Sequence, residues 1–487
     1  MRLNLGSRWR FGAATALVVA VALLGYAIAS AVRESPGHSA GNRRPSPPII
    51  SPTPPPPHRP AGPSIVLVLT DDQRWDTLWA MPIVQRDLVA HGITFADAFL
   101  VNSLCCPSRA TILTGEYSHS TGVYSDVGPH GGFHAFKDRS TIATWLRNDG
   151  YHTGLFGKYM NEYHGTYIPP GWDRWFAFQQ PPGYSNYHVN DQGTIRFFGG
   201  RPSDYSTDVL AARAVSFIRS TPGPLFLYFA PFAPHYPARP PLRYRTAFSD
   251  LPPYRPPNYN EADVSDKPAY IQRRRPFTPA NEALIDGVRR DQYRSLLAVD
   301  DAVGQIVDAL RATHRLRTTL ILFMSDNGLT WGEHRLGIFK QVPYEESIRT
   351  PFVIRDDMLI HRPRTDRHLV LNLDVAQTFA EVARVAAPGA EGNSLVPLFT
   401  DPSAPWRSDF LIEHTNGSTI PTYCAVRTVR YIYVFYSTGE RELYDLQQDP
   451  FELQNRASDP RYTAVLRYLR LRLRQLCKPP PPEYVPG

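Results

Sequence analysis

The chain has 487 residues, of which 42% are hydrophobic and 20% are charged, as is ordinary for a globular protein with room for two domains. Its formal net charge of +7 lies almost wholly in residues 1–62, which carry seven Arg, no Lys and one acid. The rest of the chain is nearly neutral. Because a nucleic-acid-binding surface needs basic residues gathered on the folded domain, the charge pattern excludes nucleic acid as an expected partner.

An apolar run spans residues 11–32 and follows three arginines, which is the pattern of a segment that directs export. Residues 1–33 are therefore either an uncleaved signal-anchor, which holds the protein in a membrane, or a cleaved signal peptide. Residues 34–62 are rich in Pro and predict an extended spacer that cannot form a core. We expect an exported protein that is either anchored at the cell surface or secreted.

Strand and helix patterns alternate through residues 63–402, the expected main domain. Unbroken apolar runs typical of strands buried on both faces lie at residues 65–70, 153–156, 225–229, 319–324 and 351–354. Apolar residues at helical spacing lie at residues 140–149, 204–219 and 291–311. This alternation predicts an α/β fold in which helices sandwich a mostly parallel sheet, with ligands bound at the carboxyl ends of the strands.

Residues 231–279 form a long stretch rich in Pro and Tyr that has neither strand nor helix periodicity. Loops of this length are usually functional or disordered. The stretch is expected to be either a lid at the rim of the site or a solvated excursion of the chain.

A different pattern begins near residue 403. Four short strand-like runs and a helical pattern lie at residues 410–413, 422–426, 431–436, 442–446 and 460–476. They predict a small C-terminal subdomain, residues 403–487, made of an antiparallel sheet and a helix. Cys424 and Cys477 both fall in it, and the sequence leaves open whether they form a disulfide in an oxidising compartment.

Polar residues directly follow two of the expected strands. Asp71 and Asp72 end the first strand of the body, and Asp326 and Asn327 follow the strand at 319–324. Taken singly, such pairs are common in helix caps and turns. Taken together, their three carboxylates and one amide oxygen suit a hard cation, Ca²⁺ or Mg²⁺, rather than Zn²⁺.

The most specific motif is the run from Cys105 to Arg109, which reads C-C-P-S-R and leads into L-T-G. Two adjacent cysteines are ordinarily a buried pair. The whole run, however, resembles the signature of the type I sulfatases, which have an alkaline phosphatase-like fold. The resemblance implies that a formylglycine-generating enzyme oxidises Cys105 to formylglycine, that residue 105 joins the metal site, and that Cys106 is the variable position. Arg109 lies about one helical turn beyond Cys105 and can face the same pocket.

Three further residues match sulfatase positions. Lys158 follows Gly157, His235 stands in P-H-Y-P, and Lys340 lies downstream of D-N-G. Alone, such a Lys is usually a solvated surface group, and such a His is usually structural. In sulfatases the matching residues contact the sulfate ester, so the resemblance implies that these cations stabilise the charge that develops on sulfate transfer. His235 and Lys340 could also protonate the leaving oxygen.

The longest resemblance is the stretch 157–172, which is similar to the branch of the N-acetylglucosamine-6-sulfatases and the heparan endosulfatases. Stretches near 344–349 and 443–453 also resemble sulfatases. Met160 is a departure, because many arylsulfatases carry at that place a His that acts in releasing sulfate. His164 and His334 are candidates for a replacement base, without a geometric argument for either.

The sequence therefore predicts a sulfatase that uses formylglycine and a divalent cation to hydrolyse a sulfated sugar of the glucosamine-6-sulfate type, or a small sulfate ester. Two alternatives stay open. A phosphodiesterase or phosphonate monoester hydrolase could use the same site on the same scaffold. A non-catalytic, exported glycan-binding protein would keep the metal and the cations but carry a plain thiol at Cys105.

Overall fold

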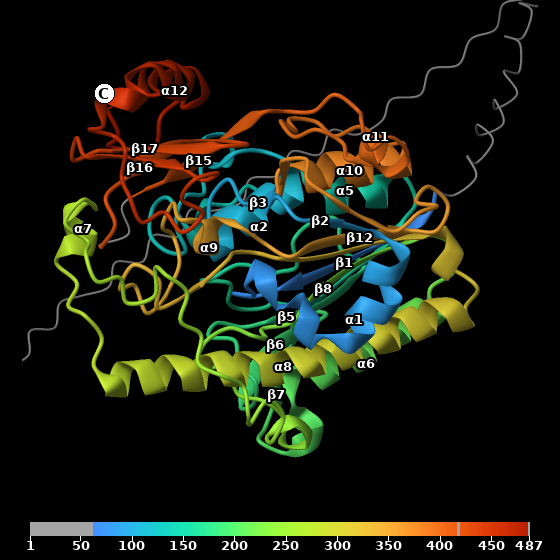
Figure 1. The fold of residues 1–487 in the computed structure, drawn as a ribbon. Helices are drawn as coiled ribbons and strands as arrows, with labels where there is room; N and C mark the ends of the chain where they lie inside the picture. Colours follow the sequence, from blue (N-terminus) through green and yellow to red (C-terminus); the bar gives the residue numbers. More distant parts are fainter. Residues whose placement is uncertain (1–61, 416–418, 486–487) are drawn as a thin grey trace, which may run out of the picture. The chain divides into compact units, whose positions relative to one another are not determined.

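A ten-stranded sheet organises the part of the chain that the computed structural model describes, residues 62–415 and 419–485 (Figure 1). In spatial order its strands are β13 (Arg364–Asp366), β2 (Ile93–Phe95), β12 (Phe352–Asp356), β9 (Thr319–Ser325), β1 (Ser64–Thr70), β8 (Leu225–Ala230), β4 (His152–Gly157), β5 (Arg174–Phe178), β6 (Tyr187–Asp191) and β7 (Thr194–Phe198). The expected signal segment, residues 1–33, lies outside the described residues, as does the expected spacer except for Gly62.

The sheet is mostly parallel, as the sequence predicts. Strands β9, β1, β8, β4 and β5 are paired in parallel, and within this sheet only β12 and β6 run against the rest. The strand expected at 351–354 is β12, which is antiparallel to β9. The chain leaves β9, forms loops at that edge and re-enters the sheet from the same edge, which requires the reversed direction.

Strand β1 shows why the sheet is buried on both faces. All seven of its residues are buried, and successive side chains point to opposite faces. Ile65, Leu67 and Leu69 belong to one hydrophobic core, whereas Val66 and Val68 belong to a second core on the other face. An unbroken apolar run is therefore what a strand between two helical layers needs.

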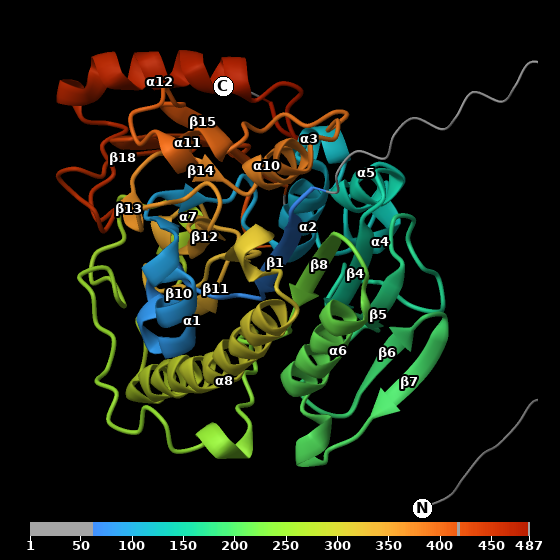
Figure 2. The ribbon, with the colours of Figure 1, turned by 90° about the vertical axis from the view of Figure 1, so that its right-hand side faces the viewer.

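Helices cover both faces of the sheet (Figure 2). The helices that contribute to the first core include α2 (Cys105–Thr114), α5 (Ile142–Asn148) and α10 (Asp374–Ala383), and those that contribute to the second include α1 (Pro82–Asp87), α6 (Ser206–Ser220) and α8 (Pro279–Ala312). The helices expected at 140–149 and 204–219 are α5 and α6. The helix expected at 291–311 is only the second part of α8, which begins after the capping residue Thr278. The first turns of α8 are largely exposed and so lack the apolar spacing that predicts a helix.

The expected C-terminal antiparallel sheet and helix are confirmed. The elements are β15 (Asp409–His414), β16 (Tyr423–Thr428), β17 (Tyr431–Tyr436), β18 (Arg441–Asp445) and α12 (Thr463–Leu476). One face of this sheet packs on α12, where Leu411 and Val426 meet Leu469 and Leu473. The other face packs on the body of the protein through a third hydrophobic core. A disulfide joins Cys424 and Cys477, the pairing that the sequence leaves open.

The remaining strands and α-helices of the described part of the chain are short. They are β3 (Ala98–Phe99), β10 (Thr330–Trp331), β11 (Ile338–Phe339), β14 (Val370–Leu371), α3 (Ser118–Thr121), α4 (Gly132–Ala135), α7 (Ala269–Gln272), α9 (Glu345–Ile348) and α11 (Val396–Thr400). Within residues 62–415 and 419–485, none of the helices combines the length and apolar character needed to cross a bilayer. The apolar run at residues 11–32, in which the sequence predicts a membrane segment, lies outside these residues.

Candidate active site

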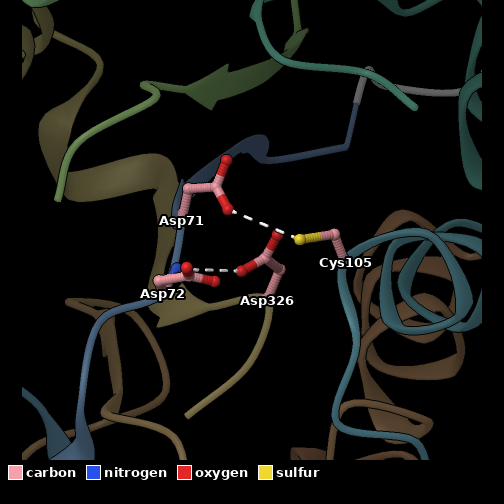
Figure 3. A group of neighbouring side chains, drawn as sticks. All are labelled: Asp71, Asp72, Cys105 and Asp326. Carbon is pink, nitrogen blue, oxygen red and sulfur yellow. Dashed lines mark hydrogen bonds between the residues drawn. The ribbon is translucent and has the colours of Figure 1, made fainter. Parts of the chain in front are cut away.

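The candidate metal ligands meet where two neighbouring strands end. Strands β1 and β9 are paired in parallel along their whole length, so the residues that follow them leave the sheet side by side. The backbone N–H of Asp72 donates to Oδ1 of Asp326 at 3.2 Å, and Nδ2 of Asn327 donates to Oδ1 of Asp72 at 2.6 Å. Asp72 has a left-handed φ of 63°, which Asp adopts more readily than bulky residues. Figure 3 shows Asp71, Asp72 and Asp326 gathered at this edge, opposite Cys105.

This donor set fits a hard cation. Ligand atoms of Asp71, Asp72, Cys105 and Asp326 lie within 4.8 Å of one another, and all four residues are buried. Oδ1 of Asn327 is also buried and has no hydrogen-bond partner among the described residues. Leaving a buried amide oxygen unpaired is costly, and binding a cation would remove that cost. Three carboxylates and one amide oxygen are ligands that Ca²⁺ and Mg²⁺ prefer.

The two adjacent cysteines have different surroundings. Sγ of Cys105 accepts a hydrogen bond from Nζ of Lys340 at 2.9 Å and lies 3.7 Å from Oδ1 of Asp71. Sγ of Cys106 instead accepts a hydrogen bond from the backbone N–H of Asn161 at 3.1 Å and belongs to the hydrophobic core. Only Cys105 therefore faces the candidate metal ligands.

Arg109 joins helix α2 to the ends of three strands. Its side chain is fully buried, and its Nε donates to Oδ2 of Asp326 at 2.8 Å. Its Nη2 lies 3.7 Å from Oδ2 of Asp71, and its Nη1 donates to the backbone oxygen of Lys158 at 2.9 Å. Arg109 thus fixes the first turn of α2, and with it Cys105, relative to the carboxylates.

The three other predicted cationic residues reach the same cluster. Nζ of Lys158 lies 2.6 Å from Oδ2 of Asp71. Nζ of Lys340 lies 2.7 Å from Oδ1 of Asp72, and Nε2 of His235 lies 3.5 Å from Oδ2 of the same carboxylate. The structure therefore brings the expected metal ligands, Cys105 and the four expected cationic side chains into one cluster.

Burial and ion pairing shift the pKa values in this cluster in opposite directions. Burial alone would raise the pKa of Asp71, but the charges of Lys158, His235 and Arg109 outweigh it and hold the pKa below its ordinary value. Burial raises the pKa of the Cys105 thiol well above its ordinary value. Burial therefore disfavours the thiolate, the nucleophilic form, at an unmodified Cys105.

A pocket of about 480 Å³ opens beside the cluster. Lys158 and His235 belong to both the cluster and the pocket, and Tyr184, Tyr236 and Arg239 contribute to the rest of the wall. This volume lies in the range of sites for small molecules. The cluster is therefore accessible from a pocket that can hold more than a single sulfate group.

The Pro-rich stretch 231–279 lines this pocket with its first residues and then packs on the body. Tyr259, Val264 and Tyr270 are buried in the hydrophobic cores. The stretch is therefore not a solvated excursion of the chain, which was one of the two expectations for it. Its first residues lie at the rim of the site, as the other expectation requires.

Neither candidate for the replacement base joins the cluster. Met160, which stands where many arylsulfatases carry a His, is fully buried. His164 is exposed. Nδ1 of His334 lies 2.7 Å from Oε2 of Glu261, and its ring stacks on Tyr344, so its contacts are with other residues.

Sequence reasoning missed two parts of the site. Oδ1 of Asp126 accepts the backbone N–H of Cys106 at 2.8 Å, and the charge of Asp126 reaches both Cys105 and Lys340. No strand end or motif marks Asp126. The pocket wall at 180–186, between β5 and β6, is marked in the sequence only by its P-P-G turn signal.

Comparisons with known proteins agree with this geometry. The sulfatase family profile matches residues 63–385, more than half of the chain. A second profile, described as N-sulphoglucosamine sulphohydrolase, C-terminal, matches residues 332–479.

Curated relatives also match most of the chain. The N-acetylglucosamine-6-sulfatase of Homo sapiens is 31% identical over 473 residues, which cover 86% of this chain and 85% of that protein. The extracellular sulfatase SULF-1 homolog of Drosophila melanogaster is 32% identical over 369 residues, which cover 73% of this chain and 33% of that protein. The chain thus spans about a third of the length of the Drosophila relative.

Solved structures show the same fold. A protein in complex with its substrate D-glucosamine-2-N,6-O-disulfate superposes with a TM-score of 0.75 at 22% identity and covers 86% of this chain and 98% of its own. The phosphonate monoester hydrolase of Agrobacterium radiobacter superposes with a TM-score of 0.70 at 21% identity and covers 85% and 95%. The expected fold class is confirmed, and sulfate and phosphonate chemistry both occur on it.

Proposed function

The chain belongs to the sulfatase family, and we propose that it hydrolyses the 6-O-sulfate ester of a glucosamine-type sugar. It is a sulfuric ester hydrolase of the kind that acts on sulfated sugars. One observation carries the proposed hydrolysis: Cys105, the oxygen-rich ligand set and the side chains of Lys158, Lys340 and His235 converge in one cluster beside a pocket. The choice of the 6-O-sulfate of a glucosamine rests on relatives that are named N-acetylglucosamine-6-sulfatase.

Formylglycine and a divalent cation are the groups that the family uses, and the residues present fit both. Asp71, Asp72, Asp326 and Asn327, with residue 105, would hold Ca²⁺ or, as the alternative, Mg²⁺. A cation bound there supplies positive charge that a sulfate oxygen can approach. A formylglycine at residue 105 supplies a hydrated aldehyde whose hydroxyl can attack sulfur. An unmodified thiol has no such hydroxyl, and burial disfavours its thiolate form.

The chain's own cations would orient the ester and neutralise it. Lys158 and Lys340 each pair with one carboxylate of the ligand set and can turn toward the sulfate oxygens once these carboxylates bind a cation. His235 lies at the boundary between cluster and pocket, where the leaving oxygen of the sugar would emerge. His235 or Lys340 would give this oxygen its proton. Arg109 acts by position, because it holds α2 against the carboxylates.

The two rival functions make different demands on this site. A phosphonate or phosphate diester hydrolase on the same fold would turn over phosphorus esters faster than sulfate esters. A glycan-binding protein without activity would bind sulfated sugar with a plain thiol at Cys105. The names of the curated relatives support the sulfatase over both.

The proposed setting is outside the cell. Two relatives are described as extracellular sulfatases, and the disulfide between Cys424 and Cys477 is typical of exported proteins. We propose that residues 1–33 direct export, either as a membrane anchor through residues 11–32 or as a signal peptide. Maturation would require a formylglycine-generating enzyme as a partner.

Hydrolysis of glucosamine-6-sulfate by two alanine variants tests the proposal. Cys105→Ala should reduce turnover to background, because residue 105 is the nucleophile. Cys106→Ala should keep substantial turnover, because its sulfur contacts the hydrophobic core and the backbone N–H of Asn161 rather than the candidate metal ligands. Equal losses of turnover in both folded variants would contradict the assignment. Faster turnover of a phosphonate monoester than of the sulfate ester by the wild-type protein would favour the rival hydrolase.

A further inference from the structure

The pocket beside the cluster contains a basic side chain to which the proposed reaction gives no role. Arg239 lines the pocket and is exposed, and no carboxylate within the described part of the chain pairs with its guanidinium. We propose that Arg239 forms a second anion-binding subsite, which takes a sulfate or carboxylate group of the sugar other than the ester that is cleaved. This inference rests on the proposed function and deepens it, because it makes sugars with two anionic groups the preferred substrates.

The charges around the pocket support this subsite. The side chains that line it include three bases, Lys158, His235 and Arg239, and no carboxylate. Lys158 and His235 already face the carboxylates of Asp71 and Asp72, at 2.6 Å and 3.5 Å. Of these three bases, only Arg239 forms no ion pair with a carboxylate of the cluster.

A neighbouring arginine, Arg243, has a structural role, because it forms ion pairs within the protein. Arg243 lies four residues further along and forms ion pairs with Asp208 at 2.7 Å and with Asp301 at 3.0 Å. Its guanidinium is fully used within the protein. Among residues 62–415 and 419–485, Arg239 has no comparable partner, and it lies at a pocket instead.

The backbone that carries Arg239 is held in place. The hydroxyl of Tyr205 donates to the backbone oxygen of Arg239 at 3.1 Å, and the hydroxyl of Tyr184 donates to the backbone oxygen of His235 at 2.8 Å. The rings of Tyr184 and Tyr205 stack on each other. The backbone from His235 to Arg239 is thus anchored at both ends.

The chemistry of the side chain suits a second anion of planar or tetrahedral shape. A guanidinium presents a fork of N–H donors that can bind two oxygens of one carboxylate or sulfate. The pocket of about 480 Å³ also exposes the ring of Tyr236, on which a sugar face can pack. A sugar whose 6-O-sulfate lies in the cluster would extend into this pocket, which Arg239 also lines.

Steady-state kinetics of Arg239→Gln, Arg239→Lys and the control Arg245→Gln test the subsite. Arg245 is an exposed arginine of the same segment that does not line the pocket. The substrates are glucosamine-6-sulfate, glucosamine-2-N,6-O-disulfate and a uronate-containing disaccharide with the same 6-O-sulfate. A charged hydrogen-bonded contact contributes about 1.5–3 kcal/mol, so Arg239→Gln should raise KM for a doubly anionic substrate about 10- to 150-fold.

The pattern across variants and substrates decides the outcome. Arg239→Gln should leave kcat and the monosulfate KM nearly unchanged, Arg239→Lys should recover part of the loss, and Arg245→Gln should match the wild type. A rise in KM for the disulfate identifies a second sulfate as the ligand, and a rise for the uronate disaccharide identifies a carboxylate. Equal KM changes for all three substrates, or none, would overturn the subsite.

Failure of the proposed function would be seen separately. If the wild-type protein hydrolyses none of these sugars, calorimetric titration with glucosamine-2-N,6-O-disulfate still tests the subsite. Weaker binding by Arg239→Gln than by Arg245→Gln would support a second anion site without the activity. Equal affinity of the two variants would overturn it.

Discussion

Replacing Arg109 by Met removes the only described ion-pair partner that Asp326 has within 4 Å. Both side chains are fully buried, and Nε of Arg109 lies 2.8 Å from Oδ2 of Asp326. Breaking a buried pair from one side typically costs about 3–5 kcal/mol, because the remaining charge is left without compensation. We expect Arg109→Met to lower the free energy of unfolding by about 4 kcal/mol when no divalent cation is present.

Urea denaturation in EDTA, followed by tryptophan fluorescence and by far-UV circular dichroism, measures this loss. Coincidence of the two transitions is needed before a free energy is assigned. Arg219→Met, at an exposed position of α6, is the matched control and should change stability by less than about 0.5 kcal/mol.

A double variant separates electrostatics from packing. Arg109→Met combined with Asp326→Leu removes both charges, so it should be more stable than Arg109→Met alone. A cost below about 1 kcal/mol for the single variant, or a double variant that loses the sum of both single changes, would refute the electrostatic role given to Arg109.

Chelation with EDTA should abolish sulfate ester hydrolysis, and Ca²⁺ or Mg²⁺ should restore it, whereas restoration by Zn²⁺ alone would contradict the oxygen-ligand argument. Replacing Cys424 and Cys477 together by Ala should lower the free energy of unfolding by about 4 kcal/mol, since the disulfide closes a loop with a sequence separation of 53; a loss below about 1 kcal/mol would show that this loop-closure reasoning does not apply here. Deleting residues 1–61 should leave turnover of a small sulfate ester unchanged, because a Pro-rich spacer buries little apolar area. The deletion should also abolish membrane association, because it removes the apolar run at residues 11–32. Loss of folding in that deletion would show that the segment packs on the body, and a mature secreted protein that begins near Ser30 would show that the segment is a cleaved signal.

The sheet and the cluster could be predicted because local patterns determine them. Unbroken apolar runs mark strands such as β1 that lie between two helical layers, and polar residues placed directly after such strands must meet at one edge of a parallel sheet. Asp71 and Asp326 lie 255 positions apart in the sequence, yet the pairing of β1 with β9 brings them together.

The rest depends on tertiary contacts that leave little local signal. The direction of β12 depends on the edge from which the chain re-enters the sheet, and the first turns of α8 are too exposed to show helical spacing. Asp126 lies in a loop and reaches Cys106 only through the fold. In the sequence, nothing distinguishes Arg239 from the other charged residues of the Pro-rich stretch, and only the fold places it at the pocket.

Mass spectrometry of the peptide that contains Cys105 and Cys106 tests directly whether residue 105 is formylglycine. The sample is active protein from a host that makes a formylglycine-generating enzyme. We expect the mass of an aldehyde at residue 105 and an unmodified thiol at residue 106, because Cys105 is the first residue of the C-x-P-S-R run and Cys106 is its variable position. The fold agrees, since only the sulfur of Cys105 faces the ligand set. An active preparation in which residue 105 is entirely a plain thiol would contradict the formylglycine mechanism.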